Sequence, residues 1–346
     1  MVPLEEGSWE RYSRQILFSP IGREGQKSFL KSRVAIIGLG ALGTVSAGSL
    51  ARAGIGFLKL VDRDFVEESN LQRQMLFDEE DARNALPKAL AAQQKISKIN
   101  SEISCQALIE DVNYGNVEGI IKDVDLVLDA TDNFEIRYLI NEACVKHNIP
   151  WIYGACLASS GYTFTILPEE TACLACFIGK VPPPPGSGLT CDTAGIISPA
   201  VNIVASLQVA EAMKLLSGNK EALQKNAQFF DLWENHFMEL EIQRNEECAV
   251  CAKREFHLLS GKNQQGTTYL CGRDAVQLLP SAPQKLSLKT MEKKLAPLGD
   301  VFATDFLLKF NDGKHEMVIF PDGRAMIKGT SDLKLARTLY ARYLGN

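Results

Sequence analysis

The sequence has no hydrophobic run long enough to span a membrane and no excess of positive charge. A transmembrane helix needs about 20 consecutive apolar residues, and no apolar run here approaches that length. The net charge is −5, so the chain as a whole is not drawn to nucleic acid or to an anionic membrane. The stretch MVPLEEGSWERYSRQ is polar and acidic and lacks the apolar core of a secretory signal. We therefore expect a cytoplasmic protein that binds neither membranes nor nucleic acid.

Histidine is scarce, whereas cysteine is frequent. The four histidines show no pairing, and we interpret each as a surface or core residue: His147, His236, His257 and His315. Nine cysteines are many for a cytoplasmic chain, in which disulfides are rare. Three of them fall within helix or strand patterns and are predicted to be core residues: Cys105, Cys144 and Cys156.

Strands alternate with helices over the first half of the chain. With 346 residues, 46% hydrophobic and 23% charged, the chain has room for two or three domains. Strands are predicted at 34–37, 57–62, 104–109, 123–133 and 150–156, and helices at 8–32, 41–54, 88–100 and 134–148. This order predicts a Rossmann-like, doubly wound α/β fold with a mainly parallel sheet. Residues 161–167 predict an added antiparallel strand, and 196–218 predict a long apolar helix.

The pattern changes near Lys253. From there the order of strands and helices no longer alternates, and the NDG and PDG turns are typical of β-hairpins. We therefore predict two domains, residues 1–256 with the parallel sheet and residues 257–346 as a small α+β domain of unknown role. Residues 181–190, VPPPPGSGLT, predict a stiff, extended segment in the first of these.

A glycine-rich loop follows the first predicted strand. Gly38, Gly40 and Gly43 fit G-x-G-x-x-G at the junction of a strand and a helix, where backbone amides and the helix N-terminus bind phosphate. Asp62 follows Gly43 by about 20 residues, where an acid can accept hydrogen bonds from ribose hydroxyls. The pattern predicts a nucleotide site, although the motif by itself does not distinguish NAD from other nucleotides.

The residues that follow favour a polyphosphate over NAD. Asn70 and Arg73 occur in NLQRQ, and Lys88 begins the next predicted helix; such side chains neutralise or hydrogen-bond phosphate oxygens. Asp129 and Asp132 come at the end of a predicted strand, where ligands bind in such folds. We assign Asp132 to magnesium and Asp129 to a structural role, and we expect one of the two to cap the helix near Phe134.

Two C-x-x-C pairs indicate a metal site. Cys173 and Cys176 form CLAC, and Cys248 and Cys251 form CAVC. Four thiolates make a closed tetrahedral zinc site, which is structural because no position is left for water. The long interval between the pairs predicts that the zinc joins two distant segments. A redox function of each pair is the alternative.

Cys191 is the remaining cysteine of interest. It follows the proline-rich segment and precedes the long helix, and a thiol near a helix N-terminus can have a lowered pKa and act as a nucleophile. The alternative is that Cys191 simply packs in the interior.

These parts suit the attack of a carboxylate on the α-phosphate of ATP. A carboxylate is already ionised at pH 7 and needs no general base, and cations that neutralise the triphosphate lower the barrier. The products are an acyl adenylate and pyrophosphate.

In order along the chain, RYSRQILF, IIGLGALG, VDRDFVEESNLQRQ, LPKA, DATDNFEIR, CLAC, TCDTAGIISP and CAVC resemble the motifs of the ThiF/MoeB/HesA family, which is related to ubiquitin-activating enzymes. The resemblance implies ATP-dependent adenylation of the C-terminal Gly-Gly of a ubiquitin-like sulfur carrier by a homodimer. It implies that Arg14 reaches the phosphates from the neighbouring subunit and that Cys191 can bond covalently to the carrier. It also implies that magnesium binds to Asp132 and zinc to the two C-x-x-C pairs. The residues that it assigns to ATP are Gly38, Gly40, Gly43, Asp62, Asn70, Arg73 and Lys88.

The carrier and pathway are left open by the motifs. We favour ThiS and thiamine thiazole synthesis, because the whole chain looks more like long ThiF proteins; MoaD and molybdopterin synthesis are the alternative. An NAD-dependent oxidoreductase would leave Asn70, Arg73, Lys88 and Asp132 without a function. A catalytically silent scaffold would have gaps in the ATP-binding set, and there are none.

Overall fold

The computed structural model describes residues 6–179, 191–261, 267–270, 275–280 and 284–345, and for 6–8, 191–192 and 267–270 it describes the backbone alone. Two compact units divide the chain: Met1–Pro182 with Ile196–Lys262, and Pro183–Gly195 with Asn263–Asn346. The predicted extended segment 181–190 lies outside the described residues. None of the described helices is long and apolar enough to cross a membrane.

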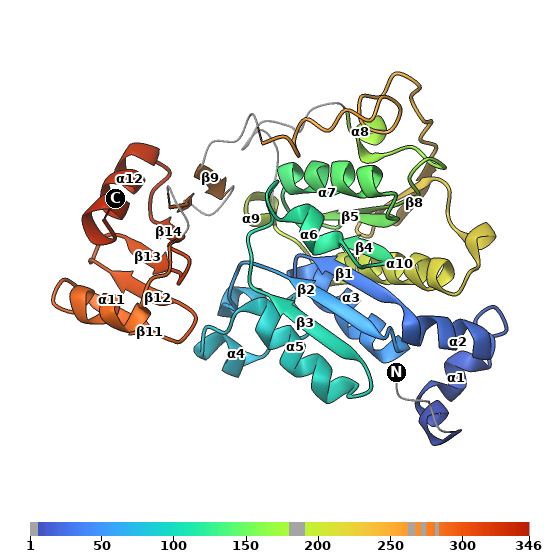
Figure 1. The fold of residues 1–346 in the computed structure, drawn as a ribbon, viewed down its shortest axis with the longest axis horizontal. Helices are drawn as coiled ribbons and strands as arrows, with labels where there is room; N and C mark the ends of the chain where they lie inside the picture. Colours follow the sequence, from blue (N-terminus) through green and yellow to red (C-terminus); the bar gives the residue numbers. More distant parts are fainter. Residues whose placement is uncertain (1–5, 180–190, 262–266, 271–274, 281–283, 346) are drawn as a thin grey trace. The chain divides into compact units, whose positions relative to one another are not determined.

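The first unit contains an eight-stranded sheet in the order β3-β2-β1-β4-β5-β6-β7-β8 (Figure 1). The first five strands in this order are parallel and the last three are antiparallel. The strands are β1 (Arg33–Ile37), β2 (Phe57–Val61), β3 (Ser104–Leu108), β4 (Leu126–Asp129), β5 (Trp151–Leu157), β6 (Ser160–Ile166), β7 (Ala227–Asp231) and β8 (His236–Leu240). The predicted parallel sheet with an antiparallel extension is confirmed. The β7–β8 hairpin was not predicted.

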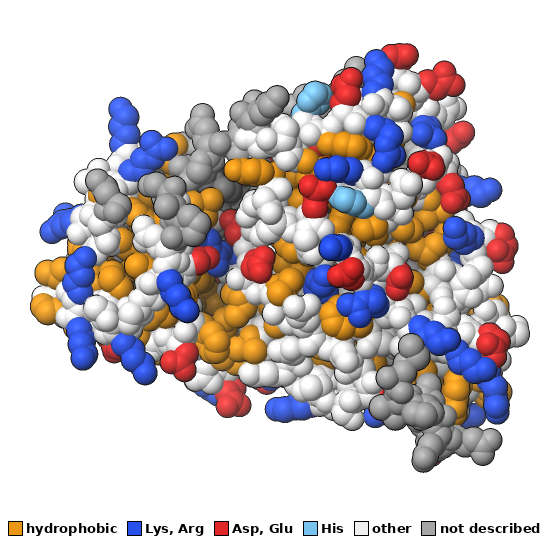
Figure 2. All heavy atoms as spheres, in the orientation of Figure 1, with side chains coloured by type: hydrophobic (Ala, Val, Ile, Leu, Met, Phe, Trp, Pro, Cys, Tyr) orange, Lys and Arg blue, Asp and Glu red, His pale blue; other side chains and the backbone are white. Residues whose placement is uncertain are grey.

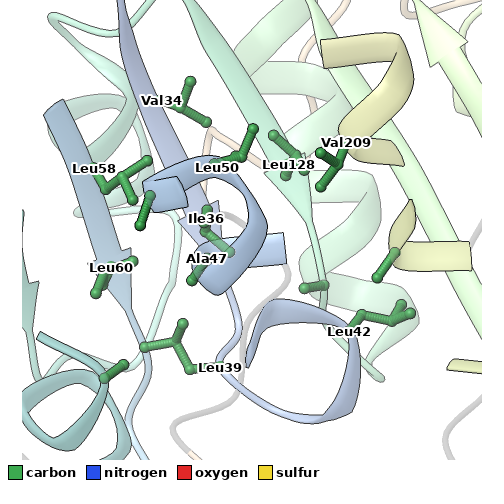
Figure 3. Close-up of a cluster of buried hydrophobic side chains, with 14 of the residues drawn as sticks. Val34, Ile36, Leu39, Leu42, Ala47, Leu50, Leu58, Leu60, Leu128 and Val209 are labelled. Carbon is green, nitrogen blue, oxygen red and sulfur yellow. The ribbon is translucent and has the colours of Figure 1, made fainter. Parts of the chain in front are cut away.

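Helices cover both faces of this sheet and bury a hydrophobic cluster on each. One face carries α2 (Gly22–Lys31), α3 (Ala41–Ala53), α5 (Lys88–Ile99) and α10 (Ser198–Leu216). The other carries α6 (Val117–Ile121), α7 (Phe134–His147) and α8 (Leu174–Phe177). Because both faces are covered, β1 has buried residues on each side: Val34 and Ile36 face α3 (Figure 3), whereas Ala35 and Ile37 belong to the opposite cluster.

The helix ends follow the sequence signals. α3 ends at Gly54, whose φ of 84° places it in the left-handed region that glycine readily adopts. The predicted helix 8–32 is interrupted, forming η1 (Glu6–Tyr12), α1 (Ser13–Ile16) and α2. The other short helices are η2 (Glu68–Asn70), α4 (Glu79–Arg83), α9 (Cys191–Ala194) and η3 (Lys220–Ala222).

The second unit contains a six-stranded antiparallel sheet in the order β11-β12-β13-β14-β10-β9. Its elements are β9 (Thr267–Leu270), β10 (Ala275–Leu278), α11 (Leu288–Leu295), β11 (Asp300–Ala303), β12 (Leu308–Asn311), β13 (Glu316–Ile319), β14 (Ala325–Lys328) and α12 (Leu333–Tyr343). The NDG turn joins β12 to β13 and the PDG turn joins β13 to β14, as predicted. Both helices pack on one hydrophobic cluster of this sheet.

Candidate active site

The glycine-rich loop lies at the carboxyl end of β1 and leads into α3. A Cβ on Gly38 would lie 2.6 Å from the Ala130 carbonyl oxygen, and one on Gly43 would lie 1.9 Å from the Gly38 carbonyl oxygen. A Cβ on Gly40 would meet nothing within 4 Å. Gly38 and Gly43 therefore allow the loop to pack closely, whereas Gly40 borders open space, where a ligand can approach the backbone.

Leu39 anchors the loop through its side chain and through its backbone N–H. Its side chain is fully buried in the cluster under α3 (Figure 3), and its N–H donates to Asp62 Oδ2 at 2.6 Å. Gly40 occupies the N-cap position of α3 and offers no side-chain cap. The first amides of α3 therefore lack the usual side-chain acceptor, as expected for a helix end that binds an anion.

Asp62 and Lys88 lie beside this loop. Asp62 Oδ1 accepts a hydrogen bond from the Asp64 N–H at 2.7 Å. Burial raises the pKa of Asp62, and the nearby Lys88 ammonium opposes the rise. Lys88 is 3% exposed, and its Nζ lies 3.5 Å from Asp64 Oδ2. The structure thus brings the predicted loop, ribose acid and lysine together at the carboxyl ends of β1 and β2.

Asn70 and Arg73 hold their own turn. Asn70 is buried, and its Oδ1 accepts from the Glu67 N–H at 3.2 Å in a capping box of η2. Arg73 Nη1 donates to the Ser69 carbonyl oxygen at 2.8 Å and is partly exposed. Their roles toward a nucleotide stay predictions.

Arg63 directly follows the predicted ribose acid and was not predicted to take part in the site. Its Nη1 lies 2.8 Å from Asp111 Oδ1, and its Nε lies 3.8 Å from Asp64 Oδ1. Burial alone would lower the pKa of Arg63, but Asp111, followed by Asp64 and Asp132, outweighs burial and raises it. The signal in the sequence was the run Asp62-Arg63-Asp64 directly after a strand.

Asp129 and Asp132 differ sharply in environment. Asp132 is exposed and makes no hydrogen bond or ion pair with any residue that the structure describes. Asp129 is fully buried, and burial raises its pKa to about 6 against the opposing effect of Arg137. The expectation that one of these acids caps α7 is wrong. Asn133 is the cap, because its Oδ1 reaches the Glu135 and Ile136 amides.

Arg14 lies in α1, and its neighbours in sequence are hydrogen-bonded to other parts of the first unit. Arg11 donates to the Ile99 carbonyl oxygen, and Tyr12 accepts from Asn100 Nδ2 at 2.9 Å. Gln15 Nε2 donates to Gln26 Oε1 and to the Ala53 carbonyl oxygen. Arg14 itself is exposed and has no hydrogen bond or ion pair within the described part of the chain. The segment is therefore fixed to the body of the unit while the Arg14 guanidinium stays available.

Four cysteines from two distant segments converge. The sulfur atoms of Cys173, Cys176, Cys248 and Cys251 all lie within 4.8 Å of one another. Individual Sγ–Sγ distances are 4.0, 3.7 and 3.5 Å, far beyond the roughly 2.05 Å of a disulfide. A tetrahedral zinc with Zn–S bonds of about 2.3 Å separates its sulfurs by about 3.8 Å. The predicted grouping is confirmed, and its geometry fits a tetrahedral metal better than two separate redox pairs.

The other cysteines include one that begins a helix. Cys191 is the first residue of α9, and its side chain lies outside the described residues. Cys144 is fully buried and Cys105 is partly buried; burial raises the pKa of Cys105 to about 12. Both are poor nucleophiles, in agreement with a core role.

The parallel strand order, the glycine-rich loop and the acid after β2 are typical of nucleotide-binding α/β proteins, and the four-cysteine cluster has a geometry that suits a metal ion. More specifically, the chain belongs to the ThiF family, whose model matches residues 12–250. This agrees with the resemblance identified in the motifs.

Curated relatives match one or both units. The chain is 44% identical to the sulfur carrier protein ThiS adenylyltransferase of Bacillus subtilis over 97% of this chain and 99% of that protein. It is 38% identical to the protein of the same name from Escherichia coli, over 72% of this chain and 97% of that one. It is 35% identical to the E. coli molybdopterin-synthase adenylyltransferase, over 73% of this chain and all of that one. The relatives are thus named adenylyltransferases.

Solved structures of E. coli MccB share the fold. The structure described as MccB with ATP has a TM-score of 0.62 and 25% sequence identity, covering 70% of this chain and 74% of that one. The structure of MccB with MccA-N7isoASN has a TM-score of 0.62 and 26% identity. Both structural matches cover about as much of this chain as the ThiF family model does.

Proposed function

We propose that this protein adenylates the C-terminal Gly-Gly carboxylate of a ThiS-type, ubiquitin-like sulfur carrier in thiamine thiazole synthesis. The observation that carries this choice is the 44% identity to the B. subtilis ThiS adenylyltransferase, which extends through both units. The adenylation domain is residues 1–256, with 257–346 as an added domain, and the enzyme acts in the cytoplasm.

ATP binds at the carboxyl ends of β1 and β2. Gly38, Gly40 and Gly43 shape the loop, and the open space beside Gly40 receives the phosphates. Asp62 accepts from the ribose hydroxyls. Asn70, Arg73 and Lys88 bind the triphosphate, and Lys88, held near Asp64, is already oriented toward this edge of the sheet.

Asp132 fits a magnesium ion bound with the triphosphate. Its carboxylate is exposed just after β4 and makes no hydrogen bond or ion pair with a described residue, and magnesium prefers such hard oxygen ligands. When bound, magnesium neutralises phosphate charge. The four thiolates of Cys173, Cys176, Cys248 and Cys251 hold zinc, which joins the segments after β6 and β8.

The carrier carboxylate attacks the α-phosphorus of ATP. The bond between this phosphorus and the oxygen that bridges it to the β-phosphate breaks, so that pyrophosphate leaves. No residue has to remove a proton, because the carboxylate is ionised at neutral pH. The cationic side chains act by neutralising the repulsion between the carboxylate and the triphosphate and by aligning the two.

Two further roles extend the site. In a homodimer, Arg14 reaches the phosphates bound by the partner subunit. Its exposed position in α1, where it makes no hydrogen bond or ion pair with a described residue, supports this role. Cys191 acts after adenylation, by linking to the activated carrier or to its sulfur. In a link to the activated carrier, the Cys191 thiolate attacks the adenylate carbonyl, AMP leaves, and a thioester forms. The position of Cys191 at the start of α9 supports this role.

MoaD is the second candidate carrier, because the E. coli molybdopterin-synthase adenylyltransferase matches at 35% identity over its full length. NAD chemistry is the distant alternative for the glycine loop.

Calorimetric titration separates the nucleotide hypotheses. Magnesium-ATP should bind with measurable heat, and NAD should not, because Lys88 and Arg73 suit the triphosphate, which NAD lacks, and a nicotinamide has no use for them. Tight NAD binding without a heat of ATP binding would contradict the proposed site.

A further inference from the structure

A buried ion pair contacts Thr131, the residue before the exposed Asp132. Asp129, the last residue of β4, is 0% exposed, and Arg137 in α7 is 6% exposed. Arg137 Nε lies 3.5 Å from Asp129 Oδ2. Neither residue is assigned to the adenylation reaction above, and neither is accessible enough to contact a substrate. A buried ion pair often adds little net stability compared with apolar side chains of similar size. We therefore look for a role of this pair in what it contacts.

The pair holds Thr131 by three hydrogen bonds. The Thr131 amide and its Oγ1 both donate to Asp129 Oδ1, at 2.9 and 2.7 Å. On the other side, Arg137 Nη2 donates to the Thr131 carbonyl oxygen at 2.6 Å. The amide, hydroxyl and carbonyl of the residue before Asp132 are therefore all fixed.

The residue after Asp132 is fixed as well. Asn133 Oδ1 accepts from the Glu135 and Ile136 amides at the start of α7. Asp132 is thus an exposed side chain between two immobilised neighbours. Its own carboxylate makes no hydrogen bond to the described residues and is left for a ligand.

The ion pair is itself secured by several elements. The Arg137 guanidinium carbon lies 5.2 Å from the centre of the Phe134 ring and 5.3 Å from that of Tyr153 in β5. Gln208 Nε2 in α10 donates to the Asp129 carbonyl oxygen at 2.8 Å and to the Ile152 carbonyl oxygen at 3.1 Å. β4, β5, α7 and α10 therefore all restrict the segment that carries Asp132.

We infer that Asp129 and Arg137 are positioning residues, which grip Thr131 and thereby hold the Asp132 carboxylate at the phosphate end of the nucleotide site. This inference rests on the proposed adenylation of a carrier by magnesium-ATP. Groups that orient a metal ligand through hydrogen bonds typically change metal affinity or activity by about 10- to 100-fold when they are removed.

Thr131→Val is the mildest test, because it removes one hydroxyl and nearly preserves volume. Thr165→Val is the matched control: Thr131 is partly buried and Thr165 in β6 is buried, and the Oγ1 of Thr165 likewise donates to a buried carboxylate, Glu211 Oε2, at 3.2 Å. The two variants lose the same kind of hydrogen bond, and only Thr131 adjoins Asp132. Arg137→Lys retains the charge but cannot reach Asp129 and the Thr131 carbonyl together.

Two readouts are compared between the variants. Hydrogen–deuterium exchange of the peptide 126–137, without ligand, should become faster in Thr131→Val and stay as in the parent protein in Thr165→Val. In ATP–pyrophosphate exchange, the magnesium concentration for half-maximal rate should rise roughly 10-fold in Thr131→Val and more in Arg137→Lys, with no change in Thr165→Val.

The outcomes separate this inference from the proposed function. If the parent protein exchanges pyrophosphate and Asp132→Asn abolishes it, while Thr131→Val and Arg137→Lys behave like Thr165→Val in both readouts, the positioning role is wrong and adenylation stands. If the parent protein shows no exchange with any carrier, the proposed function fails and the inference falls with it.

Discussion

Two acids three positions apart, Asp129 and Asp132, show how strongly a residue depends on its surroundings. Their sequence context, DATDN, predicted one structural and one ligand-binding acid, and the structure places Asp129 in the interior and Asp132 in solvent. The helix cap was assigned wrongly because Asp and Asn are equally good N-caps. Sequence preference cannot choose between neighbouring candidates when the exact start of a helix is set by packing.

Asp129 should make stability fall as pH rises through a defined window. Burial raises its pKa from 3.8 to about 6, so between these values the folded protein binds more protons than the unfolded chain. The free energy of unfolding therefore decreases from about pH 4 to about pH 6, by about 3 kcal/mol for this group. Asp129→Asn should lack this component, so in urea titrations its stability relative to the parent protein should improve by that amount from pH 4 to pH 7. Parallel pH profiles of the two proteins would contradict the assignment.

At the scale of elements, the parallel strands and their helices were predictable because their apolar residues repeat with a clear period and are bounded by glycine. The β7–β8 hairpin was not, because its second strand is exposed: Phe237 and Met238 in β8 are 65% and 40% exposed. Apolar residues on a solvent face hide the alternation on which strand prediction depends.

The two glycines that open α3 should respond differently to alanine. Gly40→Ala should fold normally, because its Cβ meets nothing within 4 Å, but should weaken ATP binding by occupying the space beside the loop. Gly43→Ala should lower the melting temperature, because its Cβ would overlap the Gly38 carbonyl oxygen. Thermal melts and ATP titrations of both variants check this. A Gly40→Ala variant with parental ATP affinity would show that the open space is not the phosphate site.

The four-cysteine cluster should contain one zinc per chain. Elemental analysis of protein purified without chelator measures it, and Cys173→Ser should lose most of the zinc together with thermal stability, since metal and fold are coupled. Cys105→Ser is the control, because Cys105 lies outside the cluster, and it should retain the metal. Stable, metal-free parent protein would exclude the zinc site.

Across the whole chain, the order of motifs was sufficient for the family, but residues 263–346 of the second unit have no motif from which to derive a role. The match to the E. coli ThiS adenylyltransferase covers 97% of that protein but 72% of this chain, so this chain is longer than that relative. The face drawn in Figure 2 shows acidic and basic side chains interspersed, in keeping with the modest net charge.

A shared site in a homodimer should be detectable by complementation. Arg14→Ala and Asp132→Ala chains are each expected to be inactive alone. If the subunits exchange freely, an equal mixture should recover up to about a quarter of the activity, because half of the dimers are mixed and each of these has one intact site. Mixed dimers without recovered activity would place Arg14 outside the partner's site.

ATP–pyrophosphate exchange with defined carriers measures the proposed adenylation itself. The protein is incubated with ATP, magnesium, labelled pyrophosphate and either a ThiS-type or a MoaD-type carrier, and each carrier is also supplied without its terminal glycine. The account predicts label in ATP with the intact ThiS-type carrier and none with the truncated one. Exchange with the MoaD-type carrier alone, or with neither carrier, would contradict it.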